Sequence, residues 1–153
     1  MSLWGKLLDL LFPPRCAFCG ALLDGEDGVC PACEAALRGL EGPGLRALDF
    51  GPCAAAFYYE GMVRQGIHGL KFQGRRQSAA VFARYMAEIA AEHFSGQFDA
   101  VTFVPVSEQR LRQRGYDQSR LLSEAMAALW DTQAEAVREK IRDNPAQAGL
   151  SSA

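Results

Sequence analysis

Two closely spaced pairs of cysteines constrain this chain more than any other feature. The pairs are Cys16-Ala-Phe-Cys19 and Cys30-Pro-Ala-Cys33, with ten residues between them. A tight turn at each pair directs two thiolates toward one point, and two such turns complete a tetrahedral site with Zn–S distances of about 2.3 Å. Because four thiolates leave no open coordination position, the pattern predicts a structural zinc rather than a catalytic one.

The sequence leaves some other uses of these cysteines open. Four thiolates also hold iron–sulfur clusters, so zinc and iron are both compatible with the pattern. Disulfides are disfavoured in a reducing compartment, and a redox Cys-x-x-Cys motif calls for one pair beside a strand-to-helix turn. The fifth cysteine, Cys53, has no partner at this spacing and is expected to be a small buried side chain. We expect the metal to supply folding energy to this short segment.

The start of the chain and its charge bear on location and partners. The apolar residues before Pro13-Pro14 fall at helical spacing and predict an amphipathic helix that packs on the rest of the protein: Leu3, Trp4, Leu7, Leu8 and Leu11. This segment lacks the features of an export signal, so a cytoplasmic location is expected. No apolar run approaches the ~20 residues of a membrane span. A net charge of −2 argues against a protein that coats nucleic acid.

A change in composition divides the chain into two predicted domains. Residues 39–52 contain four Gly and two Pro, which is typical of a linker or an irregular crossing. Residues 1–50 carry four basic and seven acidic side chains, whereas residues 51–153 carry twelve and eleven. We therefore predict an N-terminal helix and four-cysteine module at 1–51 and a second region at 52–153.

The second region has the pattern of an α/β fold. The predicted elements are, in chain order, a strand at 54–59, helices at 62–72 and 77–94, a strand at 99–106, a polar loop at 107–115 and a helix at 117–130. The run at 99–106 is mostly apolar and β-branched, which indicates a strand buried on both faces of a parallel sheet. This order begins an α/β domain.

Two clusters of basic residues are candidates for anion binding. The first lies in 61–87, which has no acidic residue and contains Lys71 beside a glycine turn. Cations at a helix C-terminus are also favourable without any ligand. The second cluster follows the 99–106 strand, where ligands of open α/β sheets bind, and leads into a helix N-terminus suited to phosphate. Its candidate residues are Arg110, Arg112, Arg114, Gly115, Tyr116, Asp117 and Gln118. Asp117 is also a candidate helix N-cap.

Taken together, these motifs resemble the ComF family of competence-associated, phosphoribosyltransferase-like proteins. The resemblance rests on the paired cysteines and on a Tyr-x-Gly-x-Val-Arg-x-x-Ile-x-x-Leu-Lys-Phe-x-Gly stretch at 59–74. It also rests on Val-Pro-Val followed by Arg-Leu-Arg-x-Arg-Gly-Tyr-Asp-Gln at 104–118, and on Gln-Ala-Gly-Leu-Ser at 147–151. The family more usually has Phe-Asn where this chain has Tyr116-Asp117.

The resemblance implies a type I phosphoribosyltransferase fold and a ligand such as phosphoribosyl pyrophosphate with Mg²⁺. It also implies a role linked to DNA uptake, and it places Lys71 and the 110–118 loop near the pyrophosphate. The family's phosphoribosyl signature, an acidic pair followed by Thr-Thr-Gly, does not occur in this sequence. We therefore expect the N-terminal part of such a protein, which does not catalyse phosphoribosyl transfer on its own.

A binding module is the alternative function. A zinc ribbon with basic patches is suited to contact single-stranded DNA or a protein of the DNA-uptake machinery. The basic stretch 61–87 supplies charge for such contacts. Aromatic residues near these charges would stack on bases, and the candidates are Phe57, Tyr58, Tyr59 and Phe72.

Overall fold

The structure is a computed structural model that describes residues 13–24 and 28–137. Its elements are α2 (Pro31–Leu37), β1 (Glu41–Leu48), β2 (Gly51–Phe57), α3 (Gly61–Phe72), α4 (Ser78–Phe94), β3 (Val101–Thr102), α5 (Glu108–Arg114), α6 (Gln118–Ala128) and β4 (Ala134–Glu135). The amphipathic helix predicted before Pro13 and the 147–151 motif lie outside the described residues.

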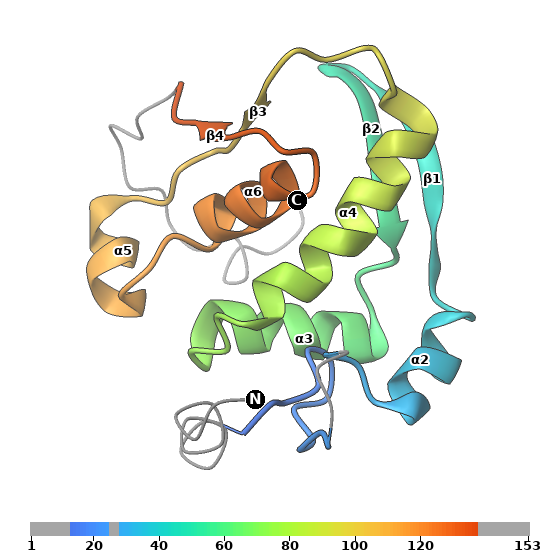
Figure 1. Cartoon of the computed structure of the whole chain (residues 1–153), viewed down its shortest axis with the longest axis vertical. Helices are drawn as coiled ribbons and strands as arrows, with labels where there is room; N and C mark the ends of the chain where they lie inside the picture. Colours follow the sequence, from blue (N-terminus) through green and yellow to red (C-terminus); the bar gives the residue numbers. More distant parts are fainter. Residues whose placement is uncertain (1–12, 25–27, 138–153) are drawn as a thin grey trace, which may run out of the picture.

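Helix α4 is the central element of the fold. The β1–β2 hairpin runs along one side of α4, and α6 packs against another side (Figure 1). Small side chains allow the close approach of the two helices, since α4 buries Ala83 and Ala87 while α6 buries Ser123 and Ala127. Helix α3 lies across the end of α4, beside the cysteine-bearing segment (Figure 1).

The three longer predicted helices are confirmed. Helix α3 spans 61–72, α4 spans 78–94 and α6 spans 118–128. In α3 the apolar spacing that predicted the helix produces its buried face, with Val63 and Leu70 in the core. The predicted strand at 54–59 overlaps β2, which begins earlier and ends at Phe57.

The prediction of a linker at 39–52 is wrong, because this segment forms β1 and the start of β2. The two strands pair antiparallel, with an irregularity between Glu41 and Gly44. A Cβ at Gly42 would lie 2.2 Å from the carbonyl oxygen of Ala55, so the missing side chain allows the strands to approach. Pro43 falls within the irregular step, where a strand tolerates the loss of an N–H. Here Gly and Pro shape a strand pair instead of an irregular linker.

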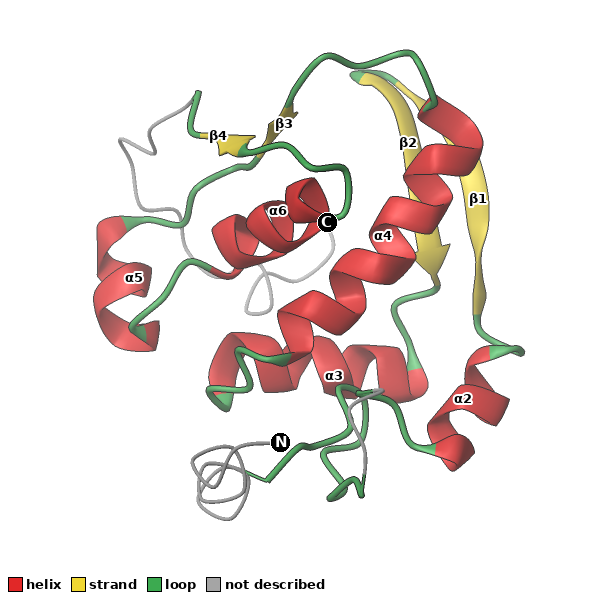
Figure 2. Cartoon of the chain, viewed as in Figure 1, coloured by secondary structure: helices red, strands yellow, loops and turns green. Residues whose placement is uncertain are grey.

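The predicted strand at 99–106 is much shorter than expected. Only Val101 and Thr102 form β3, which pairs parallel with β4. Val104 is 73% exposed, so the segment is not buried on both faces. Pro105 has no N–H to donate to a ladder, which limits how far β3 can continue. In the described part of the chain the strands form two separate two-stranded sheets, β1–β2 and β3–β4, and no larger parallel sheet (Figure 2).

The prediction of a polar loop at 107–115 is also wrong, because residues 108–114 form helix α5. The Ser107 hydroxyl caps its start by accepting a hydrogen bond from the Arg110 N–H at 3.4 Å. Glu108 and Arg112 form an i,i+4 ion pair at 2.8 Å, and Gly115 ends the helix with φ +74°. These are ordinary signals for the start and end of a helix. The sequence analysis predicted a loop instead because most residues in this segment are polar.

Candidate metal centre and cationic cluster

The four paired cysteines converge on one point. The sulfur atoms of Cys16, Cys19, Cys30 and Cys33 all lie within 4.8 Å of one another. The Cys19 and Cys30 sulfurs are 3.7 Å apart. A tetrahedron with metal–sulfur bonds of about 2.3 Å has sulfur–sulfur edges of about 3.8 Å. The four cysteines are therefore positioned to bind zinc.

The first cysteine pair forms a tight turn closed by backbone hydrogen bonds. The Gly20 N–H donates to the Cys16 carbonyl at 2.9 Å, and the Cys16 N–H donates to the Ala21 carbonyl at 2.8 Å. Gly20 has φ +80°, which an L-residue with a side chain rarely adopts, so glycine is required after the pair. The Ala21 N–H points at the Cys19 sulfur, at 3.5 Å. We name residues 16–20 the knuckle.

The second pair lies at the start of a helix. Cys30 is the N-cap of α2 and Cys33 lies in its first turn. The positive end of a helix favours thiolates, so this position stabilises the anionic sulfurs of a metal site. The Cys30 N–H also donates to the Cys16 sulfur at 3.4 Å, which ties the two pairs together.

The surroundings of the sulfurs shift their pKa values in opposite directions. Burial raises the pKa of Cys16, but N–H groups of Cys19, Cys30 and Phe18 outweigh it and hold the pKa at about 6. Burial and the neighbouring cysteine sulfurs raise the pKa of Cys33 well above its usual range. Four crowded thiols cannot all ionise without a cation, and a divalent metal held by these cysteines would supply that charge.

The spacing of the sulfurs favours a single ion over a cluster. Thiolates that ligate two or more irons must spread around several metal atoms, whereas these four sulfurs surround one point. Cys53 lies half-buried on β2 and is not part of the group. With all four ligands from protein, the centre has no open position for a substrate.

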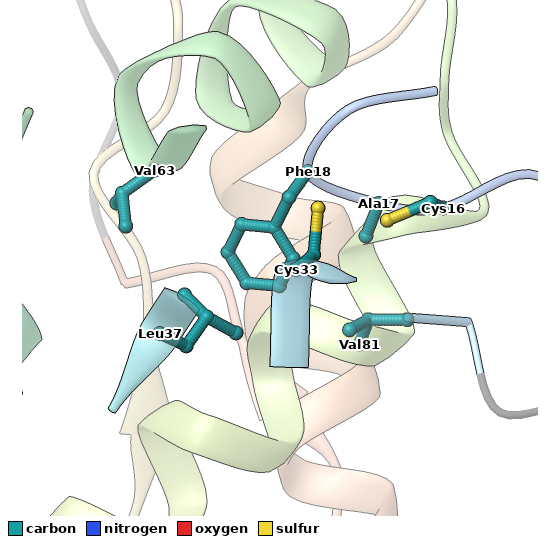
Figure 3. Close-up of a cluster of buried hydrophobic side chains, with 7 residues drawn as sticks. All are labelled: Cys16, Ala17, Phe18, Cys33, Leu37, Val63 and Val81. Atoms are coloured by element: carbon teal, nitrogen blue, oxygen red, sulfur yellow. The ribbon is translucent and has the colours of Figure 1, made fainter. Parts of the chain in front are cut away.

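The knuckle is built into the main core of the described residues. Phe18 is fully buried, and Figure 3 shows its ring between Val63, Leu37 and Cys33. Its ring also makes edge contacts with Phe82 at 5.3 Å and Tyr85 at 6.1 Å on α4. Folding of the metal centre and packing of the helices are therefore parts of one process.

A glycine on α3 makes room for the knuckle. A Cβ on Gly66 would lie 2.9 Å from the Ala17 carbonyl oxygen and 3.1 Å from the Phe18 Cα. Both of these are backbone atoms, which cannot move aside as a flexible side chain can. The glycine in the middle of α3 costs helix propensity, and the close contact with the metal centre explains its presence.

A second group of candidate residues gathers where α3 ends and α5 leads into α6. Burial and the nearby guanidinium groups of Arg114 and Arg110 lower the pKa of Lys71. The Arg114 guanidinium lies over the Phe72 ring, 4.9 Å from its centroid. We name Lys71, Arg110 and Arg114 the cationic cluster. Three positive charges at one place attract an anion that would relieve their repulsion.

The turn from α5 to α6 holds this cluster against α3. Tyr116 is buried and its hydroxyl donates to the Leu70 carbonyl of α3. The Asp117 carboxylate accepts hydrogen bonds from the Ser119 and Arg120 N–H groups at 2.8 and 3.1 Å, and from the Val106 N–H at 2.9 Å. The candidate N-cap role of Asp117 is therefore confirmed. Its carboxylate occupies the helix N-terminus that the sequence suggested for phosphate.

Of the other two predicted phosphate-binding residues, Gln118 contacts the cationic cluster and Arg112 faces solvent. Gln118 accepts a hydrogen bond from Arg114 at 2.7 Å and so holds that guanidinium in place. Arg112 pairs with Glu108 at 2.8 Å, and both side chains are largely exposed, so Arg112 stands apart from the cluster.

Arg76 joins this region although it was not among the named candidates. Its guanidinium lies 4.5 Å from the Tyr116 ring centroid and donates to the Gly115 carbonyl at 3.2 Å. Arg76 lies in the basic stretch 61–87 that the sequence analysis noted. Its contacts with Gly115 and Tyr116 become visible only in the fold.

Comparison with known families identifies the cysteine-bearing segment alone. Residues 7–44 match the model of the double zinc ribbon domain, which covers about a quarter of the chain. This segment contains Cys16, Cys19, Cys30 and Cys33, enough for one tetrahedral site. Comparisons with curated proteins and with solved structures found no match. Within the described ranges, no helix is long and apolar enough to cross a bilayer. The N-terminal segment therefore contains a zinc ribbon module of this type.

Proposed function

We propose that this chain binds a phosphate-bearing small molecule at the cationic cluster, on a scaffold that a structural zinc stabilises. The observation that carries the proposal is geometric: the Arg114 guanidinium lies over the ring of Phe72, the residue after Lys71, and Lys71 lines the same cavity as Gln118, which accepts a hydrogen bond from Arg114. Electrostatic repulsion between these like charges disfavours the folded arrangement, and a bound phosphate would offset that repulsion through charge-assisted hydrogen bonds.

The resemblance to the ComF family supports a specific first ligand. Phosphoribosyl pyrophosphate with Mg²⁺ carries the phosphate groups that the cluster would hold, in a role linked to DNA uptake or nucleotide metabolism. The Gly115-to-Gln118 turn would shape the site, with Tyr116 and Asp117 fixing the backbone while Arg114 faces the ligand. Because the acidic pair and Thr-Thr-Gly loop are missing from the sequence, we propose binding without transfer activity in this chain. A reduced thiolate site suits the cytoplasm.

Calorimetric titration of the zinc-loaded protein tests this proposal. The ligands are inorganic phosphate and phosphoribosyl pyrophosphate with Mg²⁺, and the variants are Lys71→Gln and Arg114→Gln. Loss of one charged hydrogen-bond donor should weaken binding by about tenfold or more. Arg38→Gln removes an exposed charge at the end of α2 and serves as the matched control. Equal affinity in all four proteins would show that the cluster is not the binding site.

Single-stranded DNA is a second candidate ligand, favoured by an exposed aromatic ring beside the same cations. Phe72 is 62% exposed, lies under Arg114 and contacts the His68 ring edge at 5.3 Å. Stacking on such a ring is largely independent of base sequence. In a gel-shift assay, Phe72→Ala should weaken binding of an oligodeoxynucleotide, and added salt should weaken it in both proteins. An absent or salt-insensitive shift would exclude this candidate.

A further inference from the structure

A cavity of about 310 Å³ opens beside the cationic cluster, between β2, α3, α4 and α6. Its lining is almost entirely apolar, with Ile67 and Leu70 from α3, Phe82 and Met86 from α4, and Leu122 from α6. Among the lining residues, Lys71, Gln118 and Tyr85 carry hydrogen-bonding groups on their side chains. A concave apolar wall with a few convergent polar groups is the usual form of a small-molecule site.

The cavity and the cationic cluster share Lys71 and are also linked through Gln118. Lys71 belongs to both, and Gln118 lines the cavity while accepting the hydrogen bond from Arg114. The positive charges therefore lie at the edge of the apolar space. A ligand that fills the space and also carries an anionic group would meet both kinds of surface.

The walls of the cavity favour an aromatic occupant. Phe57 and Tyr85 meet edge to face at 4.9 Å, and Phe18 and Phe82 meet edge to face at 5.3 Å. A further ring can extend this edge-to-face packing. Sugar hydroxyls placed against the same walls would lose hydrogen bonds to water and gain few in return.

We propose that the phosphate-bearing ligand of this site is an aromatic phosphate monoester, whose ring enters the cavity while its phosphate contacts Lys71 and Arg114. This inference rests on the proposed function, phosphate binding at the cationic cluster, and for the same site it names an aromatic ligand class in place of phosphoribosyl pyrophosphate. The cavity has room for one or two fused rings, near the lower end of the size range for small-molecule sites.

Titration of the zinc-loaded full chain with three probes tests the inference. The probes are inorganic phosphate, ribose 5-phosphate and 1-naphthyl phosphate. Burial of the naphthyl ring should make 1-naphthyl phosphate bind about tenfold or more tightly than the other two. Ala56 on β2 lines the cavity, so Ala56→Leu should reduce this preference by filling the space and leave phosphate binding unchanged. Ala80→Leu, on the exposed side of α4, is the matched control.

The outcomes separate the inference from the proposed function. If all three probes bind equally and Lys71→Gln weakens each, the cluster binds phosphate but the cavity does not select an aromatic ring. If Ala56→Leu keeps the naphthyl preference while thermal unfolding shows an intact fold, the ring binds elsewhere and the inference is wrong. If no probe binds the native protein, the proposed function itself fails.

Discussion

The knuckle and the cationic cluster both contact helix α3 but are built in opposite ways. Around the knuckle, backbone N–H groups point at the cysteine sulfurs and the Phe18 ring is fully buried. The protein therefore supplies every contact of this centre except those made by the metal. In the cluster, Lys71 and Arg114 come from separate helices and remain partly exposed. Four ligands that converge in a closed core indicate a structural centre, whereas neighbouring like charges at a partly exposed surface indicate a binding site.

Loss of a metal ligand should have the largest effect and would test the structural half of this comparison. Cys16→Ser removes one of four thiolates, and structural zinc contributes about 10 kcal/mol or more to small domains, as much as a typical domain's whole stability. We expect loss of bound zinc and of cooperative unfolding, measured by metal analysis and thermal denaturation. Cys53→Ser, outside the sulfur group, should retain both. Full stability of Cys16→Ser without metal would contradict a structural role.

Removal of the buried knuckle ring tests whether the metal centre and the helices share one core. Phe18→Ala should cost about 3–5 kcal/mol, because it leaves a cavity among Phe57, Phe82 and Tyr85. Chemical denaturation of the zinc-loaded protein measures this change. The control is Phe50→Ala, at a side chain that is 83% exposed, with an expected effect within about 0.5 kcal/mol. Similar stabilities of the two variants would mean that the knuckle packs independently.

A methyl group at the contact between α3 and the knuckle should have an intermediate effect. Gly66→Ala places a Cβ 2.9 Å from the Ala17 carbonyl oxygen and should destabilise the protein by about 1–3 kcal/mol, even though alanine favours helix. Gly39→Ala, where the nearest atom lies 3.8 Å away, is the control. A gain in stability from Gly66→Ala, seen in the same denaturation assay, would rule out the close approach.

The pH dependence of anion binding should be the smallest effect, and it would sharpen the binding half of the comparison. Burial, Arg114 and Arg110 lower the pKa of Lys71, so this ammonium loses its proton at a lower pH than an ordinary lysine. Sulfate affinity should therefore fall by up to about tenfold as pH rises through that lowered pKa. Sulfate has one charge state over this range, so the titrating group belongs to the protein.

The same titration in Lys71→Gln should lack this fall at alkaline pH. A matching fall in native protein and variant would assign the pH dependence to another group.

Local signals in the sequence predicted the metal centre and the longer helices, but not the pairing of distant segments. The Cys-x2-Cys spacing and Gly20 define the knuckle without further context, and apolar periodicity places α3, α4 and α6. The sequence did not predict the hairpin because Gly42 and Pro43 usually indicate a turn. Their role in a strand depends on the close approach of β2, which a single sequence does not show. The sequence did not predict the short helix α5 because its polar composition is typical of a loop. The Ser107 cap and the Glu108–Arg112 ion pair are the signals that indicated a helix.

The cationic cluster illustrates the same limit. The sequence named Lys71 and Arg114 separately, about forty residues apart, and tertiary contacts such as the Tyr116 hydrogen bond to α3 bring their helices together. Asp117 was given two possible roles, and the geometry of its three N–H contacts identifies the capping role. Tertiary contacts of this kind leave no periodic signal in a single sequence.

A phosphate titration followed residue by residue tests the central claim most directly. Zinc-loaded, isotope-labelled protein is titrated with inorganic phosphate, and amide shifts are recorded by two-dimensional NMR. The account predicts saturable shifts at Lys71, Arg110, Arg114 and Gln118, with little change at Cys30 and Cys33. Saturable shifts centred on the cysteines, or no saturable shift at the cationic cluster, would contradict it.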